Sequence, residues 1–263
     1  MKEQEQQIIY YSDELNDEFS SADITPRKID GSYDYGGHSF KWKILHIFWY
    51  KMTFRPISMF ILKFFLHHKI ENKKLLKEVR GKPYFLYGNH TNTALDPFIP
   101  TRLAYPDDIF PIVHANNVSI PFLGRIIPYL GGLPLPDTME ATKNFMAIIK
   151  QRVSENHPVM IYPEAHIWPY YTKIRPFTEL SFRYPVQYDV PTYCFTNTYQ
   201  KWKNTDKHHI VTYIDGPFYP DKNLSAKEQK KDLRDKVFAV MTERAKNSNI
   251  EIIKYIKKEE TNA

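Results

Sequence analysis

From residue 83 onward, short apolar runs alternate with amphipathic stretches along the chain. The runs have the length and the β-branched and aromatic content of strands, and they cover residues 83–88, 109–113, 132–135, 158–162, 191–197 and 209–215. Residues 138–155 carry apolar side chains on one helical face, and residues 224–247 begin with Ser225 and Glu228, a pair that forms a capping box. This alternation predicts an α/β fold with a mixed, mostly parallel central sheet flanked by helices.

Residues 41–70 form the most apolar stretch of the chain, yet Lys51, Arg55 and Lys63 interrupt it. A membrane span needs about 20 mostly apolar residues, so these charges argue against one. Pro56 lacks an N–H and restricts the residue before it, which predicts two short helices that meet near Pro56. The basic and aromatic composition is typical of helices that lie in the headgroup layer of a membrane. The alternative is that the segment packs only on the protein's own core.

Charge is unevenly distributed along the chain. Residues 1–40 carry 3 basic and 9 acidic side chains, whereas residues 41–80 carry 10 basic and 2 acidic ones. We therefore divide the chain into an acidic N-terminal extension (1–40), basic apolar membrane-associating helices (41–70) and an α/β domain (71–263). A basic block also fits nucleic acid, but no reader motif accompanies it, so we expect a membrane surface as partner and no nucleic acid.

The chain also carries two indications of compartment. Its N-terminus lacks a basic region followed by an apolar one, so no secretory signal is expected. Cys194 is the only cysteine, which excludes an intramolecular disulfide and fits a reducing compartment. We expect a protein at the cytoplasmic face of the membrane, peripheral or monotopic.

Two polar blocks directly follow predicted strands. His90 and Asp96 come after the strand 83–88. A histidine at a strand end can act as a general base, and an aspartate on its other ring nitrogen fixes its tautomer. Taken alone, a turn and a helix-capping Asp96 explain this block better. The second block, residues 162–170, follows the strand 158–162, and an ordinary turn forced by Pro163 and Pro169 is the alternative for it. Strand ends of this kind meet at one edge of an α/β sheet.

The order of these blocks resembles the lysophospholipid and glycerol-phosphate acyltransferase (PlsC-like) family. That family has a His–Asp block after one strand and an FPEG-like block after a later one. Residues 89–96 and 162–165 match these two blocks. Residues 121–136 occupy the place of a glycine- and arginine-containing block between them, and residues 190–193 match a fourth, Val-Pro block. The resemblance covers residues 80–216.

The resemblance implies an O-acyltransferase of phospholipid biosynthesis or remodelling. Acyl-CoA or acyl-carrier protein would be the co-substrate, with no other cofactor and no metal. His90 would deprotonate a hydroxyl of a glycerolipid-like acceptor such as 1-acyl-glycerol-3-phosphate, and Asp96 would orient His90. The resemblance also implies a set of substrate-binding residues: Asn89, Thr91, Arg125, Glu164, Ala165 and His166.

The chain departs from the family pattern at three places. Five residues separate His90 from Asp96, one more than in the family. Ala165 replaces the glycine of the FPEG-like block, which disfavours a positive φ there. Residues 136–137 stand where the family often has a basic residue that binds phosphate. Arg125, Lys173 and Arg175 are the candidates to replace it, and an acceptor without a phosphate is the alternative.

Two other functions stay open on the sequence. One is a metal-dependent hydrolase with ligands from the same two blocks, namely His90, Asp96, Glu164 and His166. The other is a lipid-binding protein without enzymatic activity.

Overall fold

A seven-stranded sheet forms the centre of the protein, in a computed structural model that describes residues 6–19, 24–37, 39–203 and 208–258. The strand order is β2-β8-β7-β3-β6-β4-β5, and every neighbouring pair is parallel except β7 and β8. The strands are β2 (Lys69–Glu71), β3 (Phe85–Gly88), β4 (Phe110–Val113), β5 (Leu133–Pro134), β6 (Val159–Ile161), β7 (Thr192–Lys201) and β8 (His208–Phe218). The predicted mixed, mostly parallel sheet is confirmed, because each predicted strand coincides with one of these within a few residues.

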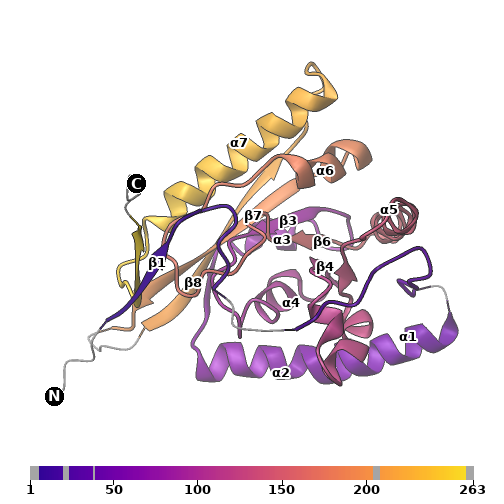
Figure 1. Cartoon of the computed structure of the whole chain (residues 1–263), viewed down its shortest axis with the longest axis horizontal. Coiled ribbons are helices and arrows are strands. Elements are labelled where there is room, and N and C mark those ends of the chain that lie inside the picture. The colour runs from indigo at the N-terminus through magenta and orange to yellow at the C-terminus, as the bar shows by residue number, and fades with distance from the viewer. Residues whose placement is uncertain (1–5, 20–23, 38, 204–207, 259–263) are drawn as a thin grey trace, which may run out of the picture.

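Helices cover both faces of this sheet (Figure 1). On one face, Phe85 and Tyr87 point into a core that contains residues of α5 (Met139–Ser154), α6 (Arg183–Tyr188) and α7 (Ala226–Ala245). On the other face, Leu86 packs with residues of α3 (Lys74–Lys77) and α4 (Ile99–Ala104). Successive side chains of a strand point to opposite faces, so a strand buried on both faces is apolar throughout. The predicted capping box at Ser225 is present at the start of α7.

One long helical stretch runs from residue 40 to residue 65, along an edge of the molecule (Figure 1). We call it the 40–65 helix, and it comprises α1 (Phe40–His46), the π-helix η1 (Ile47–Phe54), α2 (Arg55–Phe60) and the π-helix η2 (Ile61–Phe65). The predicted break at Pro56 is wrong. The N–H of Arg55 donates to the carbonyl of Tyr50 five residues back, and this wider turn accommodates the proline without ending the helix. Among the described residues, we find no helix that is both long and apolar enough to cross a membrane.

Asp108, in the loop before β4, anchors the 40–65 helix to the domain. Its buried carboxylate lies 2.7 Å from Nη2 of Arg55, 3.0 Å from Nζ of Lys51 and 3.3 Å from Nε2 of His46. Burial by itself raises the pKa of Asp108, but hydrogen bonds from His46 and Lys51 outweigh it and hold that pKa well below its usual range. The cations of this helix are therefore partly committed to the protein itself.

Short 3-10 helices complete the described part of the domain. Three of them, η3 (Asn117–Ser119), η4 (Leu123–Arg125) and η5 (Ile127–Leu130), follow one another between β4 and β5. Of these, η5 contacts α1 and η1 of the 40–65 helix. Another, η6 (Leu180–Phe182), leads directly into α6.

The acidic N-terminal segment also belongs to the fold. Strand β1 (Gln7–Tyr11) pairs in parallel with β9 (Ile253–Lys257), which places the two ends of the described chain side by side (Figure 1). Farther along, Ile29, Tyr33 and Tyr35 are buried in the core on the α5 side. The sequence pattern of this segment did not predict either contact.

Candidate active site

The end of strand β3 positions His90. Gly88 closes the strand where a Cβ atom would lie 2.1 Å from the ring of Phe195, so a side chain does not fit there. The side chain of Asn89 then extends the backbone hydrogen bonding between β3 and β7. Its Nδ2 donates to the carbonyl of Asn197 at 3.0 Å, and the N–H of Asn197 donates to its Oδ1 at 2.8 Å. His90 follows at a rigidly held point, because the residue before it is tied to the neighbouring strand β7.

His90 and Asp96 form a hydrogen-bonded pair. Nδ1 of His90 lies 2.7 Å from Oδ2 of Asp96, and the same oxygen accepts the N–H of Asn92 at 2.9 Å. The segment between them is one residue longer than in the family pattern, and it forms a turn in which the N–H of Asp96 donates to the carbonyl of Asn92. The Asp96 side chain is 1% exposed and that of His90 is 17% exposed. The pair is thus buried at its aspartate end and open at its histidine end.

The protonation pattern of the pair follows from these contacts. Burial raises the pKa of Asp96 above its ordinary value, and the hydrogen bonds from His90 and Asn92 oppose that rise. An ionised carboxylate can only accept, so Nδ1 of His90 carries the hydrogen in this arrangement. Nε2 then holds the free lone pair on the partly exposed edge of the ring. This is the tautomer that a general base needs.

Tyr162 holds both members of the pair. Its ring stacks on His90 with centroids 4.0 Å apart and planes 3° apart, and its hydroxyl donates to the carbonyl of Asp96 at 2.7 Å. The residue comes from the end of β6, the strand beside β3. Sequence reasoning missed this role. The available signal was an aromatic residue between a buried strand and Pro163.

Glu164 lies beneath the His90 loop rather than on its open side. The carboxylate is buried and accepts two backbone N–H groups, that of His90 at 3.0 Å and that of Arg175 at 3.0 Å. Nη2 of Arg175 lies 3.7 Å away, and its guanidinium stacks 5.0 Å from the ring centroid of Trp168. Burial raises the pKa of Glu164, with the Arg175 charge opposing it. Glu164 and Arg175 therefore brace the loops, and Arg175 is not free to bind a phosphate.

The other predicted substrate-binding residues are scattered. Thr91 is buried, and its hydroxyl lies 3.0 Å from that of Tyr199. Nδ1 of His166 lies 3.0 Å from Oε2 of Glu18 in the N-terminal segment. Ala165 is exposed and has φ 63°, so the expectation that alanine would avoid positive φ here is wrong. The turn after β6 requires this conformation, and the packing of Glu164 enforces it. Arg125 is exposed on η4, and no described contact joins it to the His90 loop.

The four residues of the hydrolase alternative do not converge. Glu164 points its oxygens at backbone amides, and His166 turns to Glu18. Within residues 6–19, 24–37, 39–203 and 208–258, no three His, Cys, Asp or Glu side chains are grouped so that they could hold a metal ion. The geometry of these side chains therefore gives the hydrolase alternative no support.

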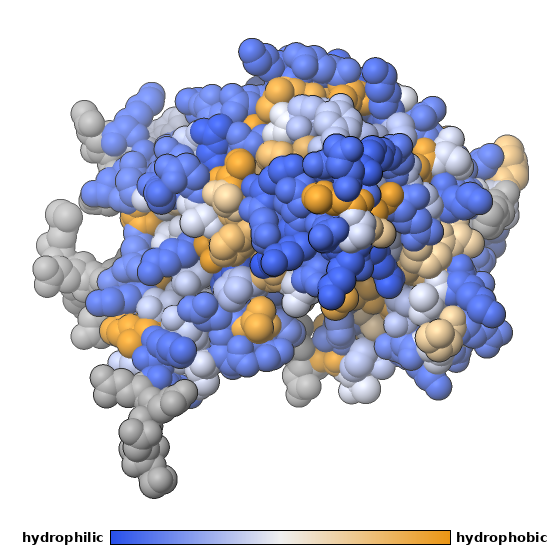
Figure 2. Space-filling model, turned by 90° about the horizontal axis from the view of Figure 1, so that it is seen from above, coloured by the Kyte–Doolittle hydropathy of each residue, from blue (hydrophilic) through white to orange (hydrophobic). Residues whose placement is uncertain are grey.

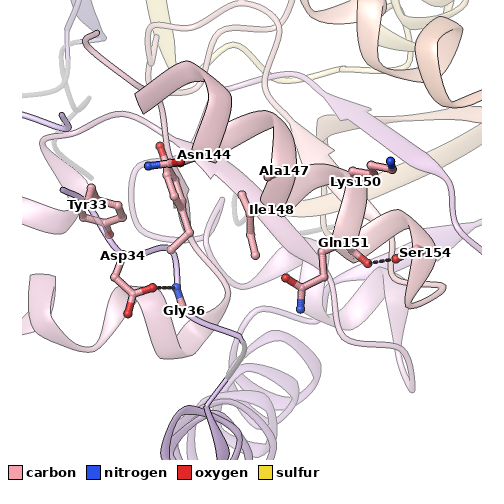
Figure 3. Close-up of a pocket in the computed structure, with 10 residues that line it drawn as sticks. Tyr33, Asp34, Gly36, Asn144, Ala147, Ile148, Lys150, Gln151 and Ser154 are labelled. Carbon is pink, nitrogen blue, oxygen red and sulfur yellow. Dashed lines mark hydrogen bonds between the residues drawn. The ribbon is translucent and has the colours of Figure 1, made fainter. Parts of the chain in front are cut away.

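A shallow cavity of about 620 Å³ lies elsewhere, between the N-terminal segment and α5 (Figure 3). Tyr33 and Asp34 line it on one side, and Asn144, Lys150 and Gln151 line it on the other. It contains none of the residues around His90, so it is distinct from the candidate active site.

Comparisons with known proteins bear on the family and the fold of the chain. Residues 67–196 match the family model described as Acyltransferase. No curated protein matches the chain. Among solved structures, the chain is similar to the 1-acyl-sn-glycerophosphate (LPA) acyltransferase PlsC from Thermotoga maritima, with a TM-score of 0.52 and 18% sequence identity over 75% of this chain and 81% of that one. The match to the family model begins just after the 40–65 helix and includes His90, Asp96 and Glu164. Residues 67–196 are thereby identified as an acyltransferase-family domain, and the fold of the chain is like that of PlsC.

Proposed function

We propose that the protein transfers a fatty acyl group from acyl-CoA or acyl-carrier protein to a hydroxyl of a glycerolipid-like acceptor, with His90 as general base. The observation that carries this proposal is the pair formed by Nδ1 of His90 and Oδ2 of Asp96, 2.7 Å apart, with the opposite edge of the ring partly exposed. The match of residues 67–196 to the acyltransferase family model supports the reaction class. The structural relative PlsC is a 1-acyl-sn-glycerophosphate acyltransferase, which supports a lysophospholipid as the first compound to test.

In this mechanism, Nε2 of His90 removes the proton of the acceptor hydroxyl while the oxygen attacks the thioester carbonyl. The new C–O bond gives a tetrahedral intermediate, and the C–S bond then breaks. The leaving thiolate takes the proton from the imidazolium, so the enzyme returns to its starting state. Asp96 stabilises the imidazolium, and Glu164 fixes the backbone of His90. No covalent enzyme intermediate forms.

The reaction is proposed to take place at the cytoplasmic surface of a membrane, reached through the 40–65 helix. Phe48, Met52 and Phe60 on this helix are 49%, 68% and 54% exposed, although all three are large and apolar. A row of exposed apolar side chains marks an interaction surface. The α7 side of the molecule contrasts with it, because hydrophilic residues dominate there and apolar ones occur only in small patches (Figure 2).

The catalytic assignment is tested with His90→Ala and a matched control, His114→Ala. His114 is exposed after β4, and its Nδ1 accepts the N–H of Asn116 in the same turn. With acyl-CoA and 1-acyl-glycerol-3-phosphate, thiol release and product mass are followed together. Loss of a general base lowers the rate by about 10²–10⁴-fold, so we expect that loss in His90→Ala and none in His114→Ala. Turnover of His90→Ala within threefold of the parent would refute the assignment.

The membrane assignment is tested by vesicle flotation. A triple variant with Phe48→Ser, Met52→Ser and Phe60→Ser should no longer float with anionic vesicles, whereas Leu180→Ser should still do so. Leu180 is 70% exposed on η6, so it matches these residues in exposure while lying on another element. Equal flotation of both variants would place the membrane contact elsewhere. Vesicle binding with no acylated product from any lipid extract would favour the lipid-binding alternative over an enzyme.

A further inference from the structure

Two cations lie partly buried without an anionic partner near strand β2. Arg102 is in α4, and Lys73 stands at the N-terminal end of α3. Nη1 of Arg102 is fully buried and has no hydrogen-bond partner among the described residues. In the described part of the chain, neither side chain forms an ion pair, whereas Arg55, Arg152 and Arg175 all do. Partial burial of a cation without a counter-charge costs free energy, so this arrangement favours binding of a negative group.

The surroundings of these cations show that the protein does not neutralise them. Arg102 exerts the strongest charge effect on both Lys73 and His68, and the charges of Lys77 and Arg80 also act on Lys73. After burial, these neighbouring cations are what lowers the pKa of Lys73. Of the carboxylates near in sequence, exposed Glu78 forms no ion pair with Lys73 in the described part of the chain, and Glu71 and Asp107 have other partners. Glu71 pairs with Lys69, and Oδ2 of Asp107 accepts the N–H of Gly81.

His68 completes the cluster as a neutral group. Its Nε2 lies 2.7 Å from Oγ1 of Thr212, and that hydroxyl donates to Oδ1 of Asn197 at 2.6 Å. Since the hydroxyl hydrogen is used in that bond, Nε2 of His68 must be the donor to Oγ1. Its Nδ1 is left as a buried acceptor that has no partner within the part of the chain that the structure describes. The cluster thus presents one guanidinium, one ammonium and one unpaired acceptor that can receive a hydroxyl hydrogen.

We propose that Lys73, Arg102 and His68 form a binding site for a phosphate group. A guanidinium fork and an ammonium together match the charge and the several oxygens of a phosphate. The unpaired Nδ1 of His68 can accept the P–OH hydrogen of a monoanionic phosphate or a hydroxyl next to it. Two sources carry this chemistry: the headgroup of an anionic lipid, and the phosphate end of coenzyme A. The second source rests on the proposed function.

The place of the cluster fits either source. Strand β2 begins at the end of the sheet where β3 ends, and the bonds from His68 through Thr212 and Asn197 reach Asn89, the neighbour of His90. Three strand spacings of about 4.8 Å separate β2 from β3, so His68, directly before β2, lies roughly 14 Å from the strand that carries His90. Phe64 and Phe65, at the end of the 40–65 helix, are exposed just upstream. A phosphate here would lie apart from the reacting carbonyl and beside the apolar surface.

The test measures phosphate binding by the full chain carrying His90→Ala, so that its outcome is independent of catalysis. Lys73→Gln and Arg102→Gln are compared with Lys74→Gln, the exposed neighbour of Lys73. Titrations with inorganic phosphate are made against chloride at equal ionic strength. We expect saturable binding that weakens at least tenfold in Lys73→Gln and Arg102→Gln but not in Lys74→Gln. Circular dichroism checks folding, and Lys73→Gln alone decides if Arg102→Gln fails to fold.

Two further arms identify the source. Tighter binding of coenzyme A than of dephospho-coenzyme A, lost in Lys73→Gln, assigns the site to the acyl donor. Binding to phosphatidic acid vesicles that is reduced tenfold in Lys73→Gln, with no such change in phosphatidylcholine vesicles, assigns it to a lipid headgroup. The proposal is overturned if phosphate acts no differently from chloride, or if Lys74→Gln weakens binding as much as Lys73→Gln does.

Discussion

Buried His68 should make the protein sensitive to mild acid. Burial, with the Arg102 charge as a second cause, lowers the pKa of His68 from 6.5 to about 3. The unfolded chain therefore binds a proton below pH 6.5 that the folded chain does not bind until about pH 3. Stability falls as the pH falls through this window, by about 1.4 kcal/mol per pH unit. Between pH 6.5 and pH 5 the loss is about 2 kcal/mol.

The measurement is urea unfolding at pH 7.5 and pH 5 for the parent, His68→Gln and His67→Gln. Glutamine keeps a donor for Thr212 but cannot take up a proton, so His68→Gln should lose about 2 kcal/mol less than the parent on acidification. His67 is the exposed neighbour, and its replacement should leave the parent's pH dependence intact. The reasoning is refuted if the parent and His68→Gln lose the same free energy of unfolding between the two pH values.

Three other substitutions test the site. Asp96→Asn should lower kcat by roughly 10³-fold with KM little changed, because the amide favours the wrong tautomer of His90; a change under tenfold in thiol release would contradict this. Glu164→Gln should lower the free energy of unfolding by about 3 kcal/mol in urea, since one backbone N–H loses its acceptor and Arg175 loses its counter-charge. For the exposed control Glu140→Gln, the free energy of unfolding should stay within about 0.5 kcal/mol of the parent value. If Glu164→Gln and Glu140→Gln change it equally, Glu164 does not brace the loops. Ala165→Gly should raise the free energy of unfolding by about 0.5–1 kcal/mol, because φ 63° suits glycine, and so should raise the melting temperature. A lower melting temperature would mean that the backbone at this position is unstrained.

The elements with strong local patterns were predictable from the sequence. The buried strands around β3 and β6 are continuous apolar runs, and α7 carries its own start signal in Ser225 and Glu228. The course of the helix through Pro56 was not predictable, because a π-helical turn depends on the packing of the whole segment rather than on the proline. The pairing of β1 with β9 was not predictable either, since it joins residues from opposite ends of the chain.

Part of the candidate site was likewise predictable from the sequence, and part was not. His90 and Asp96 are six positions apart, so a single turn can join them and their pairing follows from local sequence. Glu164 was identified as important, but its direction was not, because a carboxylate looks the same in sequence whether it faces a substrate or a backbone amide. The bracing by Arg175 and the stacking of Tyr162 require knowledge of how two loops meet.

The contact between β1 and β9 has a consequence for biosynthesis. Tyr255 of β9 stacks on Trp168 with ring centroids 5.0 Å apart, and its hydroxyl donates to the carbonyl of Pro169, in the loop that also holds Glu164. A ribosome releases these partners in order, so the loop emerges nearly ninety residues before the strand that supports it. The nascent chain can form its parallel sheet early, yet the bracing of His90 waits until β9 has left the exit tunnel. Catalytic competence should therefore appear only after β9 has been synthesised, later than the parallel sheet itself.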